Sequence, residues 1–132
     1  KNLNMMLEVI DKAIAEKNDI VVFPELSLTG YSLEDIVFDV AIKEVPSVLL
    51  EKSKEIGIIF GAVELGEEEY PYNTAYYLED GKVVKATMTD EKVVVEVPST
   101  GITDTHIIEI AGALLTLGGI GVIVYVKKKK QK

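Results

Sequence analysis

From residue 20 to residue 31 the sequence reads IVVFPELSLTGY, an apolar run followed by a turn-forming segment with one carboxylate. The apolar residues Ile20 to Phe23 predict a buried strand, and Pro24 ends it because proline has no backbone N–H to donate. Glu25 then follows the carboxyl end of a strand, where the ligand sites of α/β folds collect. Partial desolvation there would suit a general base, although the same carboxylate could instead accept backbone N–H groups within the turn.

Helical patterns flank this stretch. The first helix is predicted from apolar residues at helical spacing, namely Leu3, Met6, Leu7, Ile10 and Ile14. A second helix is expected to begin at Ser32, which can cap it together with Asp35, and to present an apolar face of Leu33, Ile36, Val37 and Val40. Pro46 is expected in the first turn of a third helix, which Gly57 ends.

Strand patterns follow the third helix. An apolar strand is predicted from Ile58 to Leu65, and two more, Tyr72 to Leu78 and Val83 to Thr87, form a hairpin through Asp80-Gly81. Asp-Gly suits this turn because both of its central positions have positive φ. A short strand is expected around residues 93–97, where valines alternate. The alternation of helices and strands therefore predicts an α/β fold whose sheet is partly antiparallel.

The composition narrows the possible functions. The chain has 132 residues and 14.5 kDa, enough for one domain, and it contains no Cys, which excludes disulfides, thiolate metal sites and a cysteine nucleophile. Residues 1–108 carry 21 acids against 9 lysines and no Arg, so they offer no basic stripe for nucleic acid. The acids Glu67 to Glu69 lack the spacing of a calcium loop and are expected to be solvated. We therefore expect no nucleic-acid partner, no metal and no cofactor.

The segment FPELSLTGY, residues 23–31, resembles the first catalytic motif of the carbon-nitrogen hydrolases, the nitrilase and amidase superfamily. The resemblance continues through Glu34-Asp35, through GIIFGAVE at residues 57–64 and through YNTAYYLEDGKVV at residues 72–84. It implies a partial nitrilase-like α/β sandwich over residues 1–84. In that family a Glu, a Lys and a Cys hydrolyse amides or nitriles, so the resemblance implies that Glu25 is the general base.

The rest of this catalytic set is missing from the sequence. The family's lysine would fall at Thr89, and Lys85 and Lys92 flank that position at the wrong offsets, so both are expected on the solvated surface. A serine or threonine nucleophile, Ser99 or Thr100, would depend on the single imidazole, His106, across a linker, which argues against it. The chain is therefore predicted to be inactive alone, or active only when a second chain supplies Lys and Cys.

The sheet of half a sandwich has one face without its usual cover. An apolar face of this kind recruits a partner or aggregates. We therefore expect this chain to form homo-oligomers through the uncovered face of its sheet.

The carboxyl-terminal region has a different character. Residues 110–126 carry no charge, and Lys127 to Lys130 and Lys132 follow directly. A helix from Ile107 to Val126 would span roughly 30 Å, the thickness of the hydrocarbon core of a bilayer. This pattern predicts a transmembrane helix with a cytoplasmic lysine tail; a hydrophobic sheet strand with a solubilising tail is the alternative.

The pentapeptide VPSTG, residues 97–101, completes a second resemblance. With the apolar span and the lysines it resembles a Gram-positive LPXTG-like cell-wall sorting signal, which implies cleavage by a sortase between Thr100 and Gly101. The expected division is a hydrolase-like body (residues 1–84), a linker with the sorting motif (85–105) and a transmembrane segment with its tail (106–132). The alternative function is then a non-enzymatic cell-surface protein anchored at Thr100, located at the membrane or cell wall, or in the cytoplasm if the segment does not insert.

Overall fold

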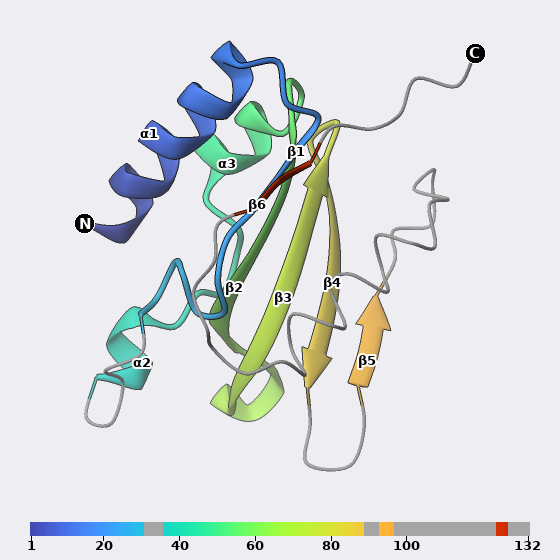
Figure 1. Ribbon diagram of the computed structural model, residues 1–132. Helices are drawn as coiled ribbons and strands as arrows, with labels where there is room; N and C mark the ends of the chain where they lie inside the picture. The colour runs from blue at the N-terminus through green and yellow to red at the C-terminus, as the bar shows by residue number, and fades with distance from the viewer. Residues whose placement is uncertain (31–35, 89–92, 97–123, 127–132) are drawn as a thin grey trace.

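The computed structural model describes residues 1–30, 36–88, 93–96 and 124–126, and these form a mixed α/β sheet with helices on one face (Figure 1). The strands lie in the order β5-β4-β3-β2-β1-β6. Their bounds are β1 Ile20–Val22, β2 Gly57–Leu65, β3 Pro71–Glu79, β4 Lys82–Met88, β5 Val93–Glu96 and β6 Val124–Val126. The helices are α1 Asn2–Ala15, α2 Val37–Val40 and α3 Ser47–Lys52, with a 3₁₀ turn, η1, at Glu67–Glu69.

Helix α1 confirms the prediction made from its apolar spacing. Met6 and Ile10 are buried together with Ala13, and they share one core cluster with alternate residues of β1, β2 and β3. The strand members of this cluster are Val21 of β1, Ile58, Phe60 and Ala62 of β2, and Tyr76 and Leu78 of β3, and they are joined by Phe23, which directly follows β1. Leu49 of α3 belongs to the same cluster, so α1 and α3 cover the same face of the sheet.

The hairpin is formed by the turn that the sequence predicts. Strands β3 and β4 pair antiparallel from Asn73↔Met88 to Glu79↔Lys82, and the turn residues Asp80 and Gly81 have φ of +51° and +72°. Both positive values agree with the expected Asp-Gly turn. Strand β2 pairs antiparallel with β3 and parallel with β1, so the predicted mixture of strand directions is also confirmed.

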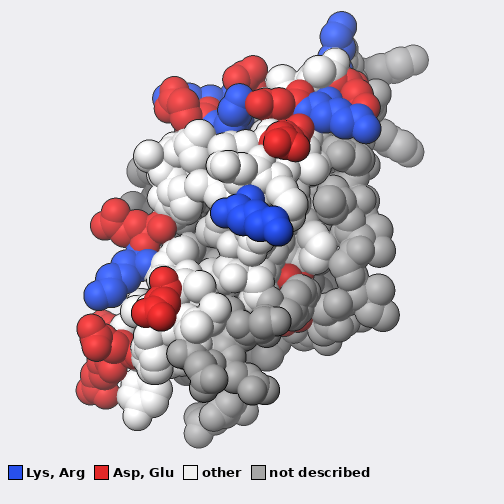
Figure 2. Space-filling model, turned by 90° about the vertical axis from the view of Figure 1, so that its left-hand side faces the viewer, with Lys and Arg blue, Asp and Glu red and all other residues white. Residues whose placement is uncertain are grey.

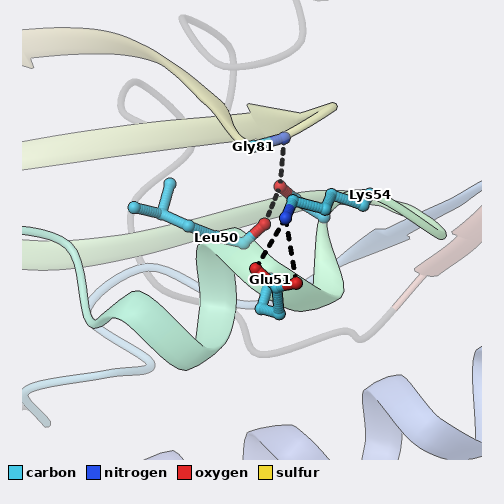
Figure 3. Close-up of polar contacts among 5 residues, drawn as sticks. Leu50, Glu51, Lys54 and Gly81 are labelled. Carbon is cyan, nitrogen blue, oxygen red and sulfur yellow. Dashed lines mark hydrogen bonds and ion pairs between the residues drawn. The ribbon is translucent and has the colours of Figure 1, made fainter.

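The end of α3 holds this turn in place. The buried Ser53 hydroxyl donates to the Leu50 carbonyl (2.6 Å) and accepts the Gly81 N–H (2.9 Å), as Figure 3 shows. Lys54 forms an ion pair with Glu51 (2.8 Å) beside these contacts. These hydrogen bonds offset the conformational entropy that is lost when the turn is ordered. They also provide partners at the end of α3, where backbone carbonyls have none within the helix.

A second contact joins α3 to α1. The Lys52 ammonium lies 2.5 Å from the Asp11 carboxylate. This hydrogen bond is the main reason that the pKa of Lys52 is raised above its ordinary value.

On the side of the molecule that Figure 2 shows, the described charged side chains of both signs gather at one end and along one edge, with mostly uncharged atoms between them.

Two helix predictions are wrong in detail. The described part of α2 begins at Val37 after Ile36, and none of its residues is buried. On the predicted apolar face Ile36 is exposed and Val37 and Val40 are only half-buried, while Leu33 lies outside the described residues. The proposed cap Ser32 and its partner Asp35 lie outside the described residues. In α3, Pro46 is the residue before the helix rather than part of its first turn, and the helix ends at Lys52, well before Gly57. The reason is that Gly57 already belongs to β2, which pairs with β1.

The face of the sheet opposite α1 and α3 has a buried cluster of its own. Ile20, Val22, Ile59, Tyr77 and Val84 form a second cluster in which no member is more than 6% exposed. The loop after β1 lies close against β2 at Gly61. The expectation of an open apolar face is therefore wrong for these residues, and homo-oligomerisation stays a prediction.

The last three residues of the predicted transmembrane helix form a strand instead. Most of the span Ile107–Val126 lies outside the described residues, but Val124–Val126 form β6, which pairs antiparallel with β1. For these three residues the strand alternative is correct, because β1 offers an open row of backbone groups. Within the described ranges, no helix has the length and hydropathy needed to cross a bilayer.

Candidate functional site

The loop that follows β1 has a tightly turned backbone. Ser27 donates its N–H to the Pro24 carbonyl (3.2 Å), and Gly30 donates to the Leu26 carbonyl (2.6 Å). Leu26 has φ of +49°, in the left-handed region that a branched side chain seldom adopts. A conformation of this cost persists only where the surroundings enforce it.

Strand β2 enforces this conformation. The Gly61 carbonyl accepts the Leu28 N–H (3.2 Å), and the Thr29 hydroxyl accepts the Val63 N–H (3.1 Å). A Cβ atom at Gly61 would lie 2.6 Å from the Leu26 nitrogen, so only glycine allows the loop to approach the strand this closely. Because Ile59 points to the face opposite α1, the alternation of the strand places this approach on that same face.

Glu25 is fixed by a residue far away in the sequence. The Asn73 side-chain amide, on β3, donates from Nδ2 to Glu25 Oε1. Asn73 pairs with Val63 and alternates with the core residue Tyr76, so it belongs to the face that carries the loop. The Glu25 carboxylate is therefore held from β3, which is separated by β2 from the strand that Glu25 follows.

Two buried polar atoms lie on residues of the same region. In the described part of the chain, Ser27 Oγ and Asn73 Oδ1 are buried and make no hydrogen bond. Buried polar atoms are rarely left without partners, and where they are, the site often has a functional reason. Glu25, Ser27 and Asn73 together define what we call the carboxylate site.

A second polar cluster lies on the helix-bearing face. The Lys85 ammonium, on β4, is 2.8 Å from Glu64 Oε1, and the Thr74 hydroxyl donates to Glu64 Oε2 (3.1 Å). Thr74 also contacts Thr87 (3.3 Å). Glu64 is only 8% exposed, and it shares its face with Ile58, Phe60 and Ala62 by alternation along β2.

This cluster corrects the expectation that Lys85 is solvated surface. Its side chain is 27% exposed and forms an ion pair with a nearly buried carboxylate, because its strand position aligns it with Tyr76 on the helix-bearing face. Lys85 and Glu25 therefore lie on opposite faces of the sheet. The structure does not bring this lysine to the carboxylate site.

The other predicted site residues divide into two groups. Those that lie outside the described residues are Thr89, Lys92, Ser99, Thr100, Gly101 and His106. The acids Glu67 to Glu69 are exposed, as expected of a solvated segment, although they form a 3₁₀ turn.

A cavity of about 170 Å³ lies elsewhere in the molecule. It is lined by residues at the start of β1, at the end of α3 and around the β3–β4 turn, among them Asp19, Ser53 and Asp80. Glu25 follows the opposite end of β1, so this cavity and the carboxylate site lie at opposite ends of that strand.

Sequence reasoning missed the partners of Glu25. Asn73 is a polar residue inside an otherwise apolar and aromatic strand, and Gly61 interrupts the apolar strand GIIFGAVE. A glycine within a strand often marks a close approach by another backbone, which was a usable signal. Nothing in the local pattern links position 73 to position 25, because that contact depends on the order of the strands.

Comparison with known proteins adds two family matches. Residues 1–108 match the model of the carbon-nitrogen hydrolase family, and residues 91–132 match the model of the LPXTG cell wall anchor motif. The first match includes the carboxylate site, and the second includes VPSTG and the lysine tail.

Two curated proteins are similar to the amino-terminal part of the chain. Apolipoprotein N-acyltransferase of Aquifex aeolicus (strain VF5) is 36% identical over 80 residues, which is 61% of this chain and 17% of the relative. Glutamine-dependent NAD(+) synthetase of Acinetobacter baylyi (strain ATCC 33305 / BD413 / ADP1) is 34% identical over 86 residues, 63% of this chain and 16% of the relative. The chain thus spans about a sixth of the length of either protein.

A solved structure also aligns with the chain. Glutamine-dependent NAD+ synthetase from Acinetobacter baumannii, in complex with ADP, aligns with 98% of this chain and with 21% of its own length. The TM-score is 0.49 and the sequence identity is 24%.

Proposed function

Because this chain belongs to the carbon-nitrogen hydrolase family, we propose that its folded body is a unit of such a hydrolase that keeps a positioned acid–base carboxylate, Glu25, without a nucleophile of its own. The observation that carries this proposal is the hydrogen bond from Asn73 to Glu25 Oε1, which holds the carboxylate in one orientation. A general base must be oriented in this way before it can act.

The geometry also supports inactivity of the chain alone. Hydrolysis of an amide by this family's chemistry needs a thiolate to attack the carbon and an ammonium to stabilise the developing charge. The sequence has no Cys, and Lys85 forms its ion pair on the other face of the sheet. Glu25 would therefore be an acid–base group without a partner for covalent chemistry.

We expect no turnover when the purified chain is incubated with a simple primary amide. Loss of the nucleophile alone lowers kcat by about 10⁶-fold in a well-studied hydrolase, which puts any residual rate below detection. Ammonia release should equal that of the matched variant Glu25→Gln. Release that is measurable in the native chain and abolished in Glu25→Gln would contradict the inactivity.

The alternative in which a second chain completes the catalytic set is tested by mixing the two chains and measuring ammonia release. A second chain that carries the family's Lys and Cys would supply the missing groups, and the mixture would then release ammonia in a Glu25-dependent manner. Co-elution of the two chains on size exclusion is required first. Separate elution, or a mixture as inert as its components, would remove this alternative.

The second candidate function is attachment to the cell surface. The match to the LPXTG cell wall anchor motif over residues 91–132 supports a cell-wall or surface location. We propose that a sortase cleaves between Thr100 and Gly101 and transfers the Thr100 carbonyl to an amine of the wall or of another subunit. In that case residues 1–84 are displayed outside the cell, residues 85–105 link them to the wall, and residues 106–132 hold the chain in the membrane before cleavage.

Sortase processing has a direct readout. Incubation of the chain with a sortase and an amine should yield a product ending at Thr100 joined to that amine, identified by its mass. Thr100→Val should abolish the product, because the scissile bond follows this residue, whereas Thr103→Val, three positions after it, should leave the product unchanged. An uncleaved native chain would count against surface attachment and would leave the hydrolase-like proposal untouched.

A further inference from the structure

Strand β6 comes from the carboxyl-terminal part of the sequence and pairs with β1 on the side away from β2. Val124–Val126 pair antiparallel with Ile20–Val22, in the register Ile20↔Val126, Val21↔Tyr125 and Val22↔Val124 (Figure 1). The same three residues end the apolar span that the cell wall anchor match includes. One short segment thus has two possible locations, the sheet and the membrane.

The directions of the backbone N–H and C=O groups of β1 show which of its residues form hydrogen bonds with β6. The Phe23 N–H donates to the Ile59 carbonyl (2.8 Å), and the Asp19 carbonyl accepts the Gly57 N–H (2.9 Å), so odd-numbered residues of this strand face β2. Successive residues of a strand direct their backbone groups to opposite sides, so Ile20 and Val22 face β6. Their register partners in β6 are Val126 and Val124, while Tyr125 directs its own N–H away from β1.

We propose that Val124–Val126 are a detachable edge strand, and that their docking on β1 and their insertion into a membrane are mutually exclusive states of this chain. A strand makes its hydrogen bonds to a neighbour, whereas a membrane-spanning helix must make all of its own within the segment. The two backbone conformations cannot coexist at the same residues. The membrane state rests on the proposed anchoring function; the docked state rests on the register given above.

The exchange between these states changes the exposure of β1. While β6 is docked, the backbone groups of Ile20 and Val22 are paired, and β1 is an interior strand of the sheet. When the segment leaves for the membrane, β1 becomes the edge strand, with an unpaired row of donors and acceptors. The side chains of β1 are buried on both faces, so its pairing with β2 holds the strand in place in either state.

Amide hydrogen exchange of the full chain, followed by NMR, tests this proposal. In lipid-free buffer the amides of Ile20 and Val22 should be protected, and Val124→Pro should lower their protection at least about tenfold by removing the N–H that faces Val22. Val126→Pro should do the same through Ile20. Tyr125→Pro is the matched control and should preserve the protection, because its N–H faces away from β1. Val21 and Phe23, which face β2, should stay protected in all four proteins.

Vesicles of phosphatidylglycerol provide the second arm, since the lysine tail favours an anionic surface. Addition of these vesicles to the native chain should lower the protection of Ile20 and Val22 to the level of Val124→Pro, with Phe23 unchanged. Equal exchange at Ile20 in the native chain and in Val124→Pro would overturn the docked state. Full protection of Ile20 and Val22 in chains that co-sediment with vesicles would overturn the exclusivity. Sortase cleavage is measured separately, so a failure of the anchoring function is distinguishable from a failure of docking.

Discussion

Lys85→Met is expected to lower the free energy of unfolding by about 3 kcal/mol, because it leaves the Glu64 carboxylate without its cation in a nearly dry site. Glu64 is 8% exposed. Its Oε1 lies beside the Lys85 ammonium, and its Oε2 accepts a hydrogen bond from the Thr74 hydroxyl. Thr74 can satisfy one oxygen but cannot neutralise the charge. Removing one member of a buried ion pair costs more than the pair itself contributes, since the remaining charge has lost its water as well. Denaturant unfolding followed by circular dichroism measures the loss.

Two further variants separate this effect from a general effect of losing a lysine. Lys82→Met makes the same change on the same strand at an exposed position, and it should shift the free energy of unfolding by no more than about 0.5 kcal/mol. The double variant Glu64→Leu with Lys85→Met removes both charges, and it should recover about 2 kcal/mol of the loss. Equal effects of Lys85→Met and Lys82→Met would show that Glu64 is well solvated and that the ion pair contributes little.

Gly61→Ala is expected to cost about 3 kcal/mol, the upper end of the range for overpacking a core. The added Cβ atom would lie 2.6 Å from the Leu26 nitrogen and 3.1 Å from the Glu25 Cα atom. Both atoms belong to the backbone, so no rotamer change relieves the clash, and the loop must move away from β2. The Leu28 hydrogen bond to Gly61 and the Asn73 contact to Glu25 should then be lost together.

The side-chain amide resonance of Asn73 reports this second consequence. Its chemical shift in the native chain should differ from that in Glu25→Ala, and Gly61→Ala should reproduce the Glu25→Ala value. Gly81→Ala is the matched control. A Cβ atom there meets no heavy atom closer than 3.6 Å, so only the positive φ opposes it, at a cost of about 1 to 2 kcal/mol. An Asn73 resonance that stays native in Gly61→Ala would mean that the loop does not depend on Gly61.

Much of the fold was predictable because its signals are local. The helical spacing of the first 14 residues, the apolar run at residues 20–23 and the Asp-Gly turn each act over a few positions, and each produced the expected element. The prediction was wrong where a local signal competed with a distant partner. Gly57 resembles the end of a helix, but β1 recruits it into a strand. Residues 36–40 have an apolar pattern, yet no residue of α2 is buried.

The candidate site shows the same division between local and distant effects. The motif FPELSLTGY singles out Glu25, but its placement, its partner Asn73 and the approach at Gly61 require three segments to meet. Lys85 looks like an ordinary surface lysine in the sequence. Its pairing with Glu64 depends on β3 lying between β2 and β4, which places the two residues on one face across the sheet.

The amino-acid sequence alone predicted the α/β class, the hairpin and the resemblance of residues 1–84 to the carbon-nitrogen hydrolases, which the family match over residues 1–108 confirms. It also showed the lack of a cysteine nucleophile, and all of these depend on composition, on short periodic patterns and on a motif. The pairing of strands established which side chains surround Glu25, which face holds Lys85 and where Val124–Val126 lie. The physical reason is that hydrogen bonds between strands join residues far apart in the chain. Only the packed sheet sets which of several compatible partners each strand takes.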